Sequence, residues 1–206
     1  MTNELLFRIV FSALWVIFFG NVIWVSYSAR GSAGKQTTRR ARLLRIAALA
    51  LAVLYFAGAL LYALIPSLVM FLSILLPDWF RLVMVSLAAL GVSIVTWGLS
   101  ELGKNWAPSV SGVRKDSALV TSGLYGFVRH PIYLGAFIFL AAQALVAANL
   151  LILLPTLALL AVLYKSIVEE ETMLIDRFGD QYREYMKRTA RFIPRFRRGH
   201  TSQQRK

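Results

Sequence analysis

Two polar clusters flank a long apolar stretch in the second half of the chain. The first cluster surrounds His130, and the second begins with Glu169-Glu170-Glu171. Between them, residues 132–168 carry only one formal charge, Lys165. Ionisable groups beside a hydrocarbon layer are costly, and they are therefore often functional. Carboxylates next to aromatic rings suit a ligand with a sulfonium or ammonium cation. This pattern predicts a ligand site at a membrane surface.

The candidate catalytic residues are Glu171, Glu170 and His130. Proline is favoured at the first position of a helix, so His130-Pro131 predicts a helix start whose free N–H groups favour a carboxylate. Non-catalytic roles are also open: Arg129 and Tyr133 suit membrane anchoring, and the glutamates suit simple solvation after a span.

Cysteine and histidine counts limit the possible chemistry. The sequence has no cysteine and only two histidines, His130 and His200. Disulfides, thiolate metal sites and a cysteine nucleophile are thereby excluded, as is a site built from several histidines. We therefore expect no metal ion.

The elements that position these residues are expected to be membrane helices. The 206 residues are 58% hydrophobic, which is too apolar for an ordinary soluble domain. The sequence predicts an all-α integral membrane protein with about five transmembrane helices, since a span needs about 20 mostly apolar residues. The expected spans are Leu5–Tyr27, Leu43–Leu64, Trp79–Leu99, Pro131–Val146 and Leu150–Val168. The segment Ser67–Leu76 is apolar but short, and it either spans or lies at the interface.

The last two predicted spans form a helical hairpin, which turns at residues 147–149. We expect the N-terminal spans to occupy residues 1–100. Residues 101–206 would then form the functional core, with a connecting loop, the hairpin and a cytoplasmic helical tail. Within the tail, Thr172–Tyr185 has helical spacing with a possible interruption at Gly179.

Charge distribution predicts the orientation. The chain has 23 Lys and Arg against 10 Asp and Glu, and the basic residues gather in alternate loops and in the tail. The positive-inside rule then places the N-terminus outside and the C-terminus in the cytoplasm, with both polar clusters on the cytoplasmic side. Orientation in a lipid bilayer therefore accounts for the excess of basic residues, and no nucleic acid partner is expected.

The second half of the chain resembles the isoprenylcysteine carboxyl methyltransferase family, together with related bacterial and phospholipid methyltransferases. The resemblance covers about a third of the chain. The matching residues are Gly123, Tyr125, Arg129, His130, Pro131, Tyr133, Glu170, Glu171, Phe178, Gly179, Tyr182, Tyr185 and Arg191-Phe192-Ile193-Pro194.

This resemblance implies a methyltransferase that uses S-adenosylmethionine (AdoMet) in a cytoplasm-facing pocket. The methyl acceptor would be lipophilic or prenylated, as in protein-S-isoprenylcysteine O-methyltransferase. Glu171 would close the pocket, with Glu170 nearby. The implied cofactor-binding residues are Ser117, Ala118, Leu119, Val120, Tyr125, His130, Pro131, Ile132, Tyr133, Glu170 and Glu171.

One position departs from the family pattern. Isoprenylcysteine-specific members carry an arginine five residues before the second glutamate, where this chain has Ser166 beside Lys165. These two residues are the candidates for substrate binding, although a lysine ammonium does not replace a planar guanidinium. The departure puts an isoprenylcysteine substrate in doubt.

Other functions fit the same sequence. Sterol reductases resemble the C-terminal architecture and would use NADPH. A phospholipid N-methyltransferase would share the cofactor and differ in the acceptor. A non-catalytic membrane protein that retains the fold is a third possibility. Binding of S-adenosylhomocysteine rather than NADPH distinguishes the methyltransferases from the reductases.

Overall fold

The computed structural model describes residues 2–28, 39–103 and 118–194, and these residues are helical apart from turns and two isolated bridges. This agrees with the all-α prediction. The elements in chain order are α1 (Thr2–Ser28), α2 (Arg39–Leu64), η1 (Pro66–Leu68), η2 (Met70–Leu72), α3 (Asp78–Leu102), α4 (Leu124–Phe127), α5 (Pro131–Ala147), α6 (Leu150–Phe178) and α7 (Asp180–Arg188).

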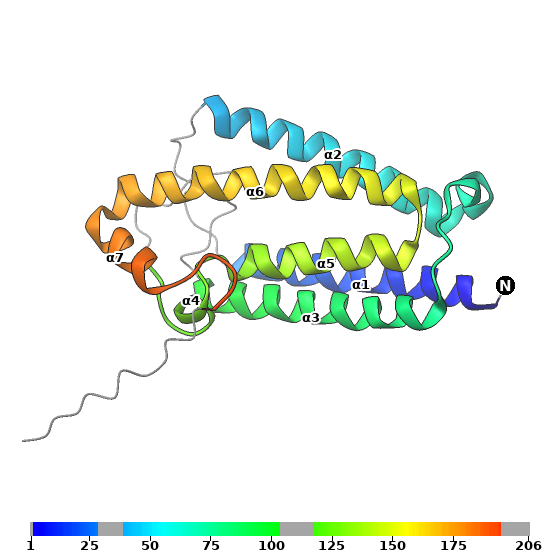
Figure 1. Cartoon of the computed structure of the whole chain (residues 1–206), viewed down its shortest axis with the longest axis horizontal. Helices are drawn as coiled ribbons and strands as arrows, with labels where there is room; N and C mark the ends of the chain where they lie inside the picture. The colour runs from blue at the N-terminus through cyan, green and yellow to red at the C-terminus, as the bar shows by residue number, and fades with distance from the viewer. Residues whose placement is uncertain (1, 29–38, 104–117, 195–206) are drawn as a thin grey trace, which may run out of the picture.

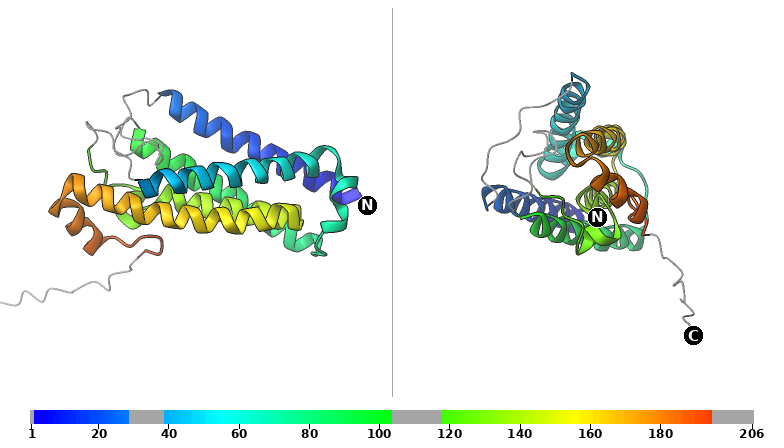
Figure 2. Two further views of the ribbon diagram at one scale, coloured as in Figure 1. Left: turned by 90° about the horizontal axis from the view of Figure 1, so that it is seen from above. Right: turned by 90° about the vertical axis from the view of Figure 1, so that its left-hand side faces the viewer.

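The five long helices run roughly along the long axis of the molecule (Figure 1). Helix α3 packs mainly on α5 and α1, whereas α2 packs on α6. Two further views show the short helix α7 beside the end of α6, away from the start of the chain (Figure 2). The helices α4 and α7 therefore lie at one end of the bundle, and η1, η2 and the start of α1 lie at the other.

The predicted spans correspond to observed helices. Four helices, α1, α2, α3 and α6, are long and apolar enough to cross a membrane, whereas α5 is a shorter apolar helix of 17 residues. The described part of the chain thus has four candidate spans where the sequence predicted about five. The segment after α2 forms two 3-10 turns, so it is not a further long helix.

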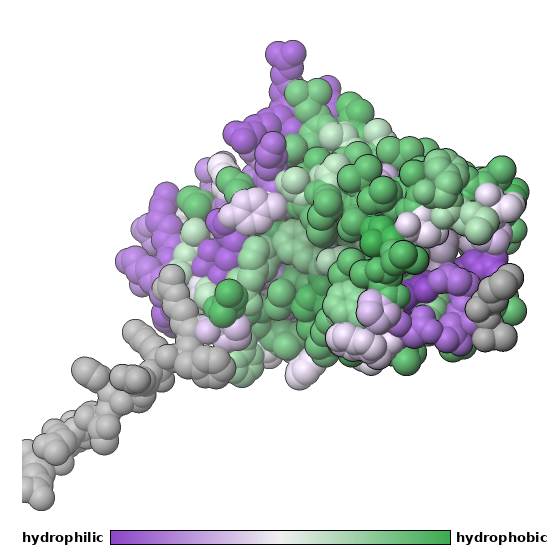
Figure 3. All heavy atoms as spheres, turned by 45° about the vertical axis from the view of Figure 1, so that its right-hand side comes forward, coloured by the Kyte–Doolittle hydropathy of each residue, from purple (hydrophilic) through white to green (hydrophobic). Residues whose placement is uncertain are grey.

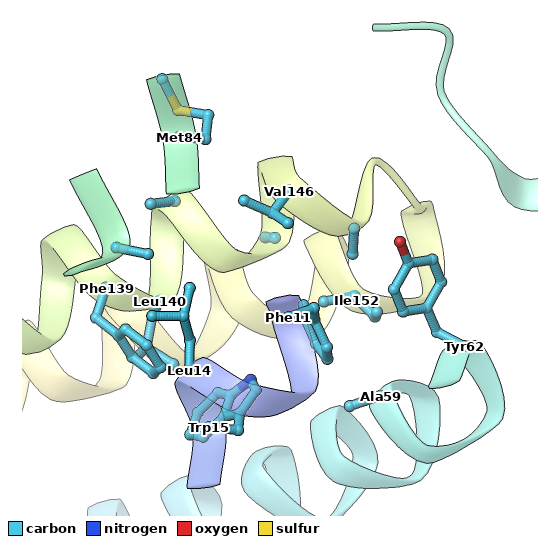
Figure 4. Close-up of a cluster of buried hydrophobic side chains, with 14 of the residues drawn as sticks. Phe11, Leu14, Trp15, Ala59, Tyr62, Met84, Phe139, Leu140, Val146 and Ile152 are labelled. Atoms are coloured by element: carbon cyan, nitrogen blue, oxygen red, sulfur yellow. The ribbon is translucent and has the colours of Figure 1, made fainter. Parts of the chain in front are cut away.

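The core lies between α1, α2, α3, α5 and α6. Its aromatic centre joins Trp15 to Phe139 with ring centroids 4.8 Å apart, and the indole N–H donates to the Tyr55 hydroxyl at 3.1 Å. Figure 4 shows Leu14 and Trp15 beside Phe139 and Leu140, and Phe11 near Ile152. Burying such rings, whose edges meet the faces of others, stabilises the contact between helices.

Helices α3 and α5 approach closely because two glycines face each other. A Cβ atom at Gly91 would lie 2.7 Å from the carbonyl oxygen of Gly135, and one at Gly135 would lie 2.7 Å from that of Gly91. Membrane helices commonly use small residues in this way, so that their backbones pack directly. The contact holds the start of α5, and thus His130, against the rest of the bundle.

We expect Gly135→Ala to weaken the bundle. The added methyl group would force α3 and α5 apart, which typically costs about 1–3 kcal/mol. Gly20→Ala is the matched control, because nothing lies within 4 Å of the position of its Cβ atom. Thermal unfolding in detergent should show a lower midpoint for Gly135→Ala and an unchanged or higher one for Gly20→Ala. Equal midpoints would contradict this packing.

A buried arginine joins the helices at the end opposite α7. Arg81 is 3% exposed, and its Nε atom donates to the carbonyl of Val146 at 2.9 Å. Its guanidinium pairs with Glu4, donates to the Tyr62 hydroxyl at 3.2 Å and lies 3.8 Å from the ring centroid of Phe7. One side chain therefore connects α1, α2, α3 and α5.

The hairpin and its tail carry the polar clusters to one end. Asn149 caps α6 by accepting from the backbone N–H of Leu151 at 3.0 Å. From there α6 runs continuously to Phe178, so the three glutamates lie within the helix rather than after it. Gly179 has a φ of 56°, a conformation that favours glycine, and the chain turns there into α7. The predicted interruption at Gly179 is confirmed.

Candidate active site

Glu171 is the centre of a buried ionic cluster at the end of the bundle that holds α4 and α7. Its carboxylate accepts from Arg129 Nη2 at 2.8 Å and lies 3.2 Å from His130 Nε2. Arg191 also pairs with it, and this hydrogen bonding raises the pKa of the guanidinium. The side chain of Glu171 is 6% exposed. We call these four residues, Arg129, His130, Glu171 and Arg191, the Glu171 cluster.

The cluster joins three parts of the chain that are distant in sequence. Arg129 precedes α5, Glu171 lies on α6, and Arg191 follows α7. Backbone contacts align the first and last parts, since Arg129 N–H donates to Ala190 at 2.8 Å and His130 N–H donates to Arg191 at 3.3 Å. The Arg129 side chain also donates to the Thr189 carbonyl. These hydrogen bonds hold the segment after α7 against the residues at which α5 begins.

The neighbouring glutamates have different partners. Among the described residues, Glu170 accepts one hydrogen bond, from the Tyr133 hydroxyl at 2.8 Å, and it is half-buried. Glu169 pairs at 2.9 Å with Arg40 on α2, whose side chain is 71% exposed. Glu171 is thus held in the interior by cations, whereas Glu170 retains capacity to accept from a bound ligand. The hairpin was expected to bring Tyr125, His130 and Tyr133 near Glu170 and Glu171, and the structure places His130 and Tyr133 in contact with them.

Tyr125 is buried where α4 meets α3 and α7. Its hydroxyl donates to the carbonyl of Gly98 at 3.4 Å, and its own carbonyl accepts from the Tyr185 hydroxyl at 2.5 Å. Burial raises the pKa of Tyr185, so this hydroxyl remains protonated and donates. The Tyr125 ring is therefore part of the packing that holds α4.

A carboxylate on α3 holds the turn before Tyr125. Glu101 Oε2 accepts from the backbone N–H of Leu124 at 2.8 Å. An acid at the C-terminal end of a helix interacts unfavourably with the helix dipole, and this hydrogen bond offsets that cost for Glu101. Gly123 has a φ of 55°, and a Cβ atom there would lie 1.8 Å from Glu101 Oε1. Only glycine fits this turn while Glu101 is in place.

We expect Gly123→Ala to displace the segment before Tyr125 and to weaken ligand binding. Gly126→Ala is the control, because its Cβ atom would meet only the Thr121 carbonyl at an ordinary 3.5 Å. Calorimetric titration with S-adenosylhomocysteine should show reduced affinity for Gly123→Ala and wild-type affinity for Gly126→Ala. Equal affinity for both variants would remove Glu101 and Gly123 from any role in shaping the site.

The other predicted cofactor-binding residues lie in two places. Pro131 and Ile132 pack against α3, since a Cβ atom at Gly98 would lie 3.5 Å and 3.0 Å from their side chains. Their side chains thus serve helix packing. Ala118, Leu119 and Val120 precede α4 without regular secondary structure, and Ser117 lies outside the described residues.

The two candidate substrate residues lie on α6, ahead of the glutamates. Lys165 is exposed. Ser166 is half-buried, and its hydroxyl donates to the carbonyl of Val162 in its own helix at 3.0 Å. Neither residue joins the Glu171 cluster.

Sequence reasoning missed the arginine partners of Glu171. Arg129 and Arg191 were recognised only as parts of motifs, and Glu101 was not singled out. A signal was available in the sequence, because Glu169-Glu170-Glu171 is the one run of acids in a chain rich in arginine. Buried carboxylates are rarely without a cationic partner. The sequence does not show which arginines turn inward.

The part of the chain that contains Glu171 matches the model of a known protein family. The family model of the isoprenylcysteine carboxyl methyltransferases matches residues 83–176, which include α5 and Glu171. Residues 83–176 are therefore similar to that family. The resemblance noted in the sequence is therefore confirmed, and the match extends back into α3.

Related proteins agree with this assignment. Protein-S-isoprenylcysteine O-methyltransferase of Schizosaccharomyces pombe is 36% identical over 107 residues, which are 51% of this chain and 45% of that protein. Methanethiol S-methyltransferase 1 of Bradyrhizobium diazoefficiens is 47% identical over 72 residues, or 34% of this chain and 24% of that protein.

A solved structure has a fold similar to that of this chain. The eukaryotic intramembrane Ras methyltransferase (isoprenylcysteine carboxyl methyltransferase) superposes with a TM-score of 0.51 at 27% identity. The match covers 73% of this chain and 51% of that one. This chain thus spans about half or less of the length of these three proteins.

Proposed function

We propose that this protein is an integral membrane methyltransferase that uses AdoMet and acts on a lipophilic acceptor. The observation that carries the proposal is the pairing of Tyr133 with Glu170 beside the Glu171 cluster, inside the segment that matches the methyltransferase family. The position of the basic residues supports a cytoplasmic site and an outside N-terminus. We also propose that residues 101–206 form the methyltransferase core and residues 1–100 its N-terminal spans.

The residues present fit AdoMet. The molecule carries an ammonium and a sulfonium cation, for which the Glu170 carboxylate and the Tyr133 ring are suitable partners. The Tyr182 hydroxyl adds a polar group, because it is buried and lacks a hydrogen-bond partner among the described residues. Burial first, and then the charge of Glu171, raise the pKa of Tyr182, so its hydroxyl remains protonated and can donate. When bound, AdoMet supplies an electrophilic methyl group.

The residues of this chain would act mainly by position. Glu170 and Tyr133 would orient the bound molecule, while the Glu171 cluster holds α5, α6 and the segment after α7 in a fixed relation. The segment after α7, which contains Arg191 and Phe192, would cover the site. It contacts α5 there, since the centroid of the Phe192 ring lies 5.5 Å from that of Phe137. Holding two reactants in line and excluding water accelerate a transfer reaction without a covalent enzyme intermediate.

The acceptor is proposed only by class. Relatives named for an isoprenylcysteine protein and for methanethiol both match this chain, so the shared core accommodates different acceptors. Ser166 stands where isoprenylcysteine-specific members carry arginine, and its hydroxyl is engaged with Val162. This favours a lipophilic acceptor that does not depend on a guanidinium at that position.

Transfer of a labelled methyl group tests the function. The purified protein should move radiolabel from AdoMet into a lipid-soluble product of a membrane extract, and Glu170→Gln should reduce this transfer. If the purified protein instead oxidised NADPH in the presence of the same extract, with no methyl transfer, it would be assigned to the reductases.

A further inference from the structure

The end of the bundle opposite the candidate site has an apolar and a polar part. Figure 3 shows hydrophobic and hydrophilic surfaces side by side at this end. The polar part includes Asn3, which donates to Asp78, and the Glu4–Arg81 pair. The apolar part is the connection between α2 and α3, residues 65–77, which we call the apolar loop. We propose that the apolar loop inserts into the lipid leaflet at this end.

Large apolar side chains of the apolar loop are exposed. The exposed fraction is 97% for Leu75, 78% for Phe71, 68% for Met70 and 57% for Leu68. The sequence has no charged residue between Arg45 and Asp78. Contiguous exposed apolar side chains mark a surface that another apolar phase covers. The loop directly joins two helices suited to a membrane, so lipid is the apolar phase at hand.

Backbone hydrogen bonding is a second feature of the apolar loop. Lipid offers no partner for N–H and C=O groups, so an inserted segment must satisfy them internally. The 3-10 turns do this in part: Leu68 N–H donates to Ile65 at 3.1 Å, and Leu72 N–H donates to Val69 at 3.0 Å. Ile74 N–H donates to the carbonyl of Ala148 at 2.7 Å.

The loop is also held in one orientation. Asn149, at the turn between α5 and α6, is 1% exposed, and its Nδ2 atom donates to the Val69 carbonyl at 2.8 Å. Val69 is 3% exposed and packs into the core, whereas its neighbours Met70 and Phe71 point outward. The apolar side chains are therefore presented on a fixed support, which lowers the entropic cost of insertion. This answers whether the segment spans: it lies at the interface.

Single cysteines test the insertion, because the chain has none of its own. Phe71→Cys and Leu75→Cys place a label in the apolar loop. Asn3→Cys places one in the polar part, and Leu90→Cys places one on the 50% exposed lipid-facing surface of α3. Each variant is reconstituted in phosphatidylcholine vesicles and treated with a membrane-impermeant maleimide. Labelling after denaturation confirms that each thiol is intact.

We expect loss of maleimide labelling at Phe71→Cys and Leu75→Cys relative to Asn3→Cys. Bimane attached at these two loop positions in detergent should, after reconstitution, be quenched most by lipids with a nitroxide near the headgroup. At Leu90→Cys, quenching should be strongest with a nitroxide deep in the chains. Labelling of the loop as fast as at Asn3→Cys would overturn the proposal. Protection without quenching would also overturn it, since it would indicate cover by protein.

Discussion

Replacing Glu171 with glutamine should destabilise the protein more than replacing either neighbouring glutamate. The carboxylate is buried between Arg129, His130 and Arg191, and its loss leaves the buried Arg129 guanidinium, 8% exposed, without a counter-charge. Breaking a buried ion pair by removing one partner costs about 3–5 kcal/mol. Thermal unfolding in detergent should show a markedly lower midpoint for Glu171→Gln.

Glu169→Gln is the matched control for this effect. It removes the same charge two residues away. The Glu169 side chain is 15% exposed, but its partner Arg40 is 71% exposed and stays hydrated when the carboxylate is lost, so we expect a contribution close to that of exposed pairs, about 0–1 kcal/mol. The unfolding midpoint of this variant should stay near that of the wild type. If Glu171→Gln and Glu169→Gln unfolded at the same temperature as the wild type, the Glu171 cluster would not hold the tail against the hairpin.

Replacing Glu170 with glutamine should have the opposite profile, with ligand affinity lost and stability kept. Within the described ranges Glu170 has one hydrogen-bond partner, the Tyr133 hydroxyl, and it lies half-buried at the site rather than inside the Glu171 cluster. Hydrogen bonds to charged groups are worth about 1.5–3 kcal/mol, so the affinity for AdoMet should fall by about tenfold or more. Isothermal titration measures this directly.

Tyr133→Phe separates the hydroxyl from the ring. The variant keeps the aromatic face but removes the donor to Glu170, so it should lose less affinity than Glu170→Gln. If Glu170 contacts the sulfonium, Glu170→Gln should weaken AdoMet binding more than binding of S-adenosylhomocysteine, which lacks that charge. Wild-type affinity of both ligands for Glu170→Gln would exclude Glu170 from the binding site.

Helices and their boundaries were largely predictable from the sequence. Hydropathy defined the ends of the long helices to within a few residues, except that α6 continues ten residues past Val168 to Phe178. Gly179 marked the turn into α7. The span count was less predictable, because α5 is apolar throughout but only 17 residues long. Its contact with α3 through Gly91 and Gly135 depends on which faces meet, and hydropathy contains no such information.

The candidate site was predictable as a neighbourhood but not as a set of partners. The hairpin was expected to bring Tyr133 and His130 to the glutamates, and it does so. The different roles of Glu170 and Glu171 follow from a difference of about 100° around the helix and from the path of the tail. The return of Arg191 to the start of α5 is a tertiary contact between distant residues, so no local pattern predicts it.

The most direct test of the account is calorimetric titration of the detergent-purified wild-type protein with S-adenosylhomocysteine, alongside Glu170→Gln, Glu169→Gln and NADPH. The account predicts saturable binding to the wild type and to Glu169→Gln, weakened binding to Glu170→Gln, and no binding of NADPH. Absence of binding to a folded wild-type protein, or binding of NADPH in its place, would contradict the proposed methyltransferase.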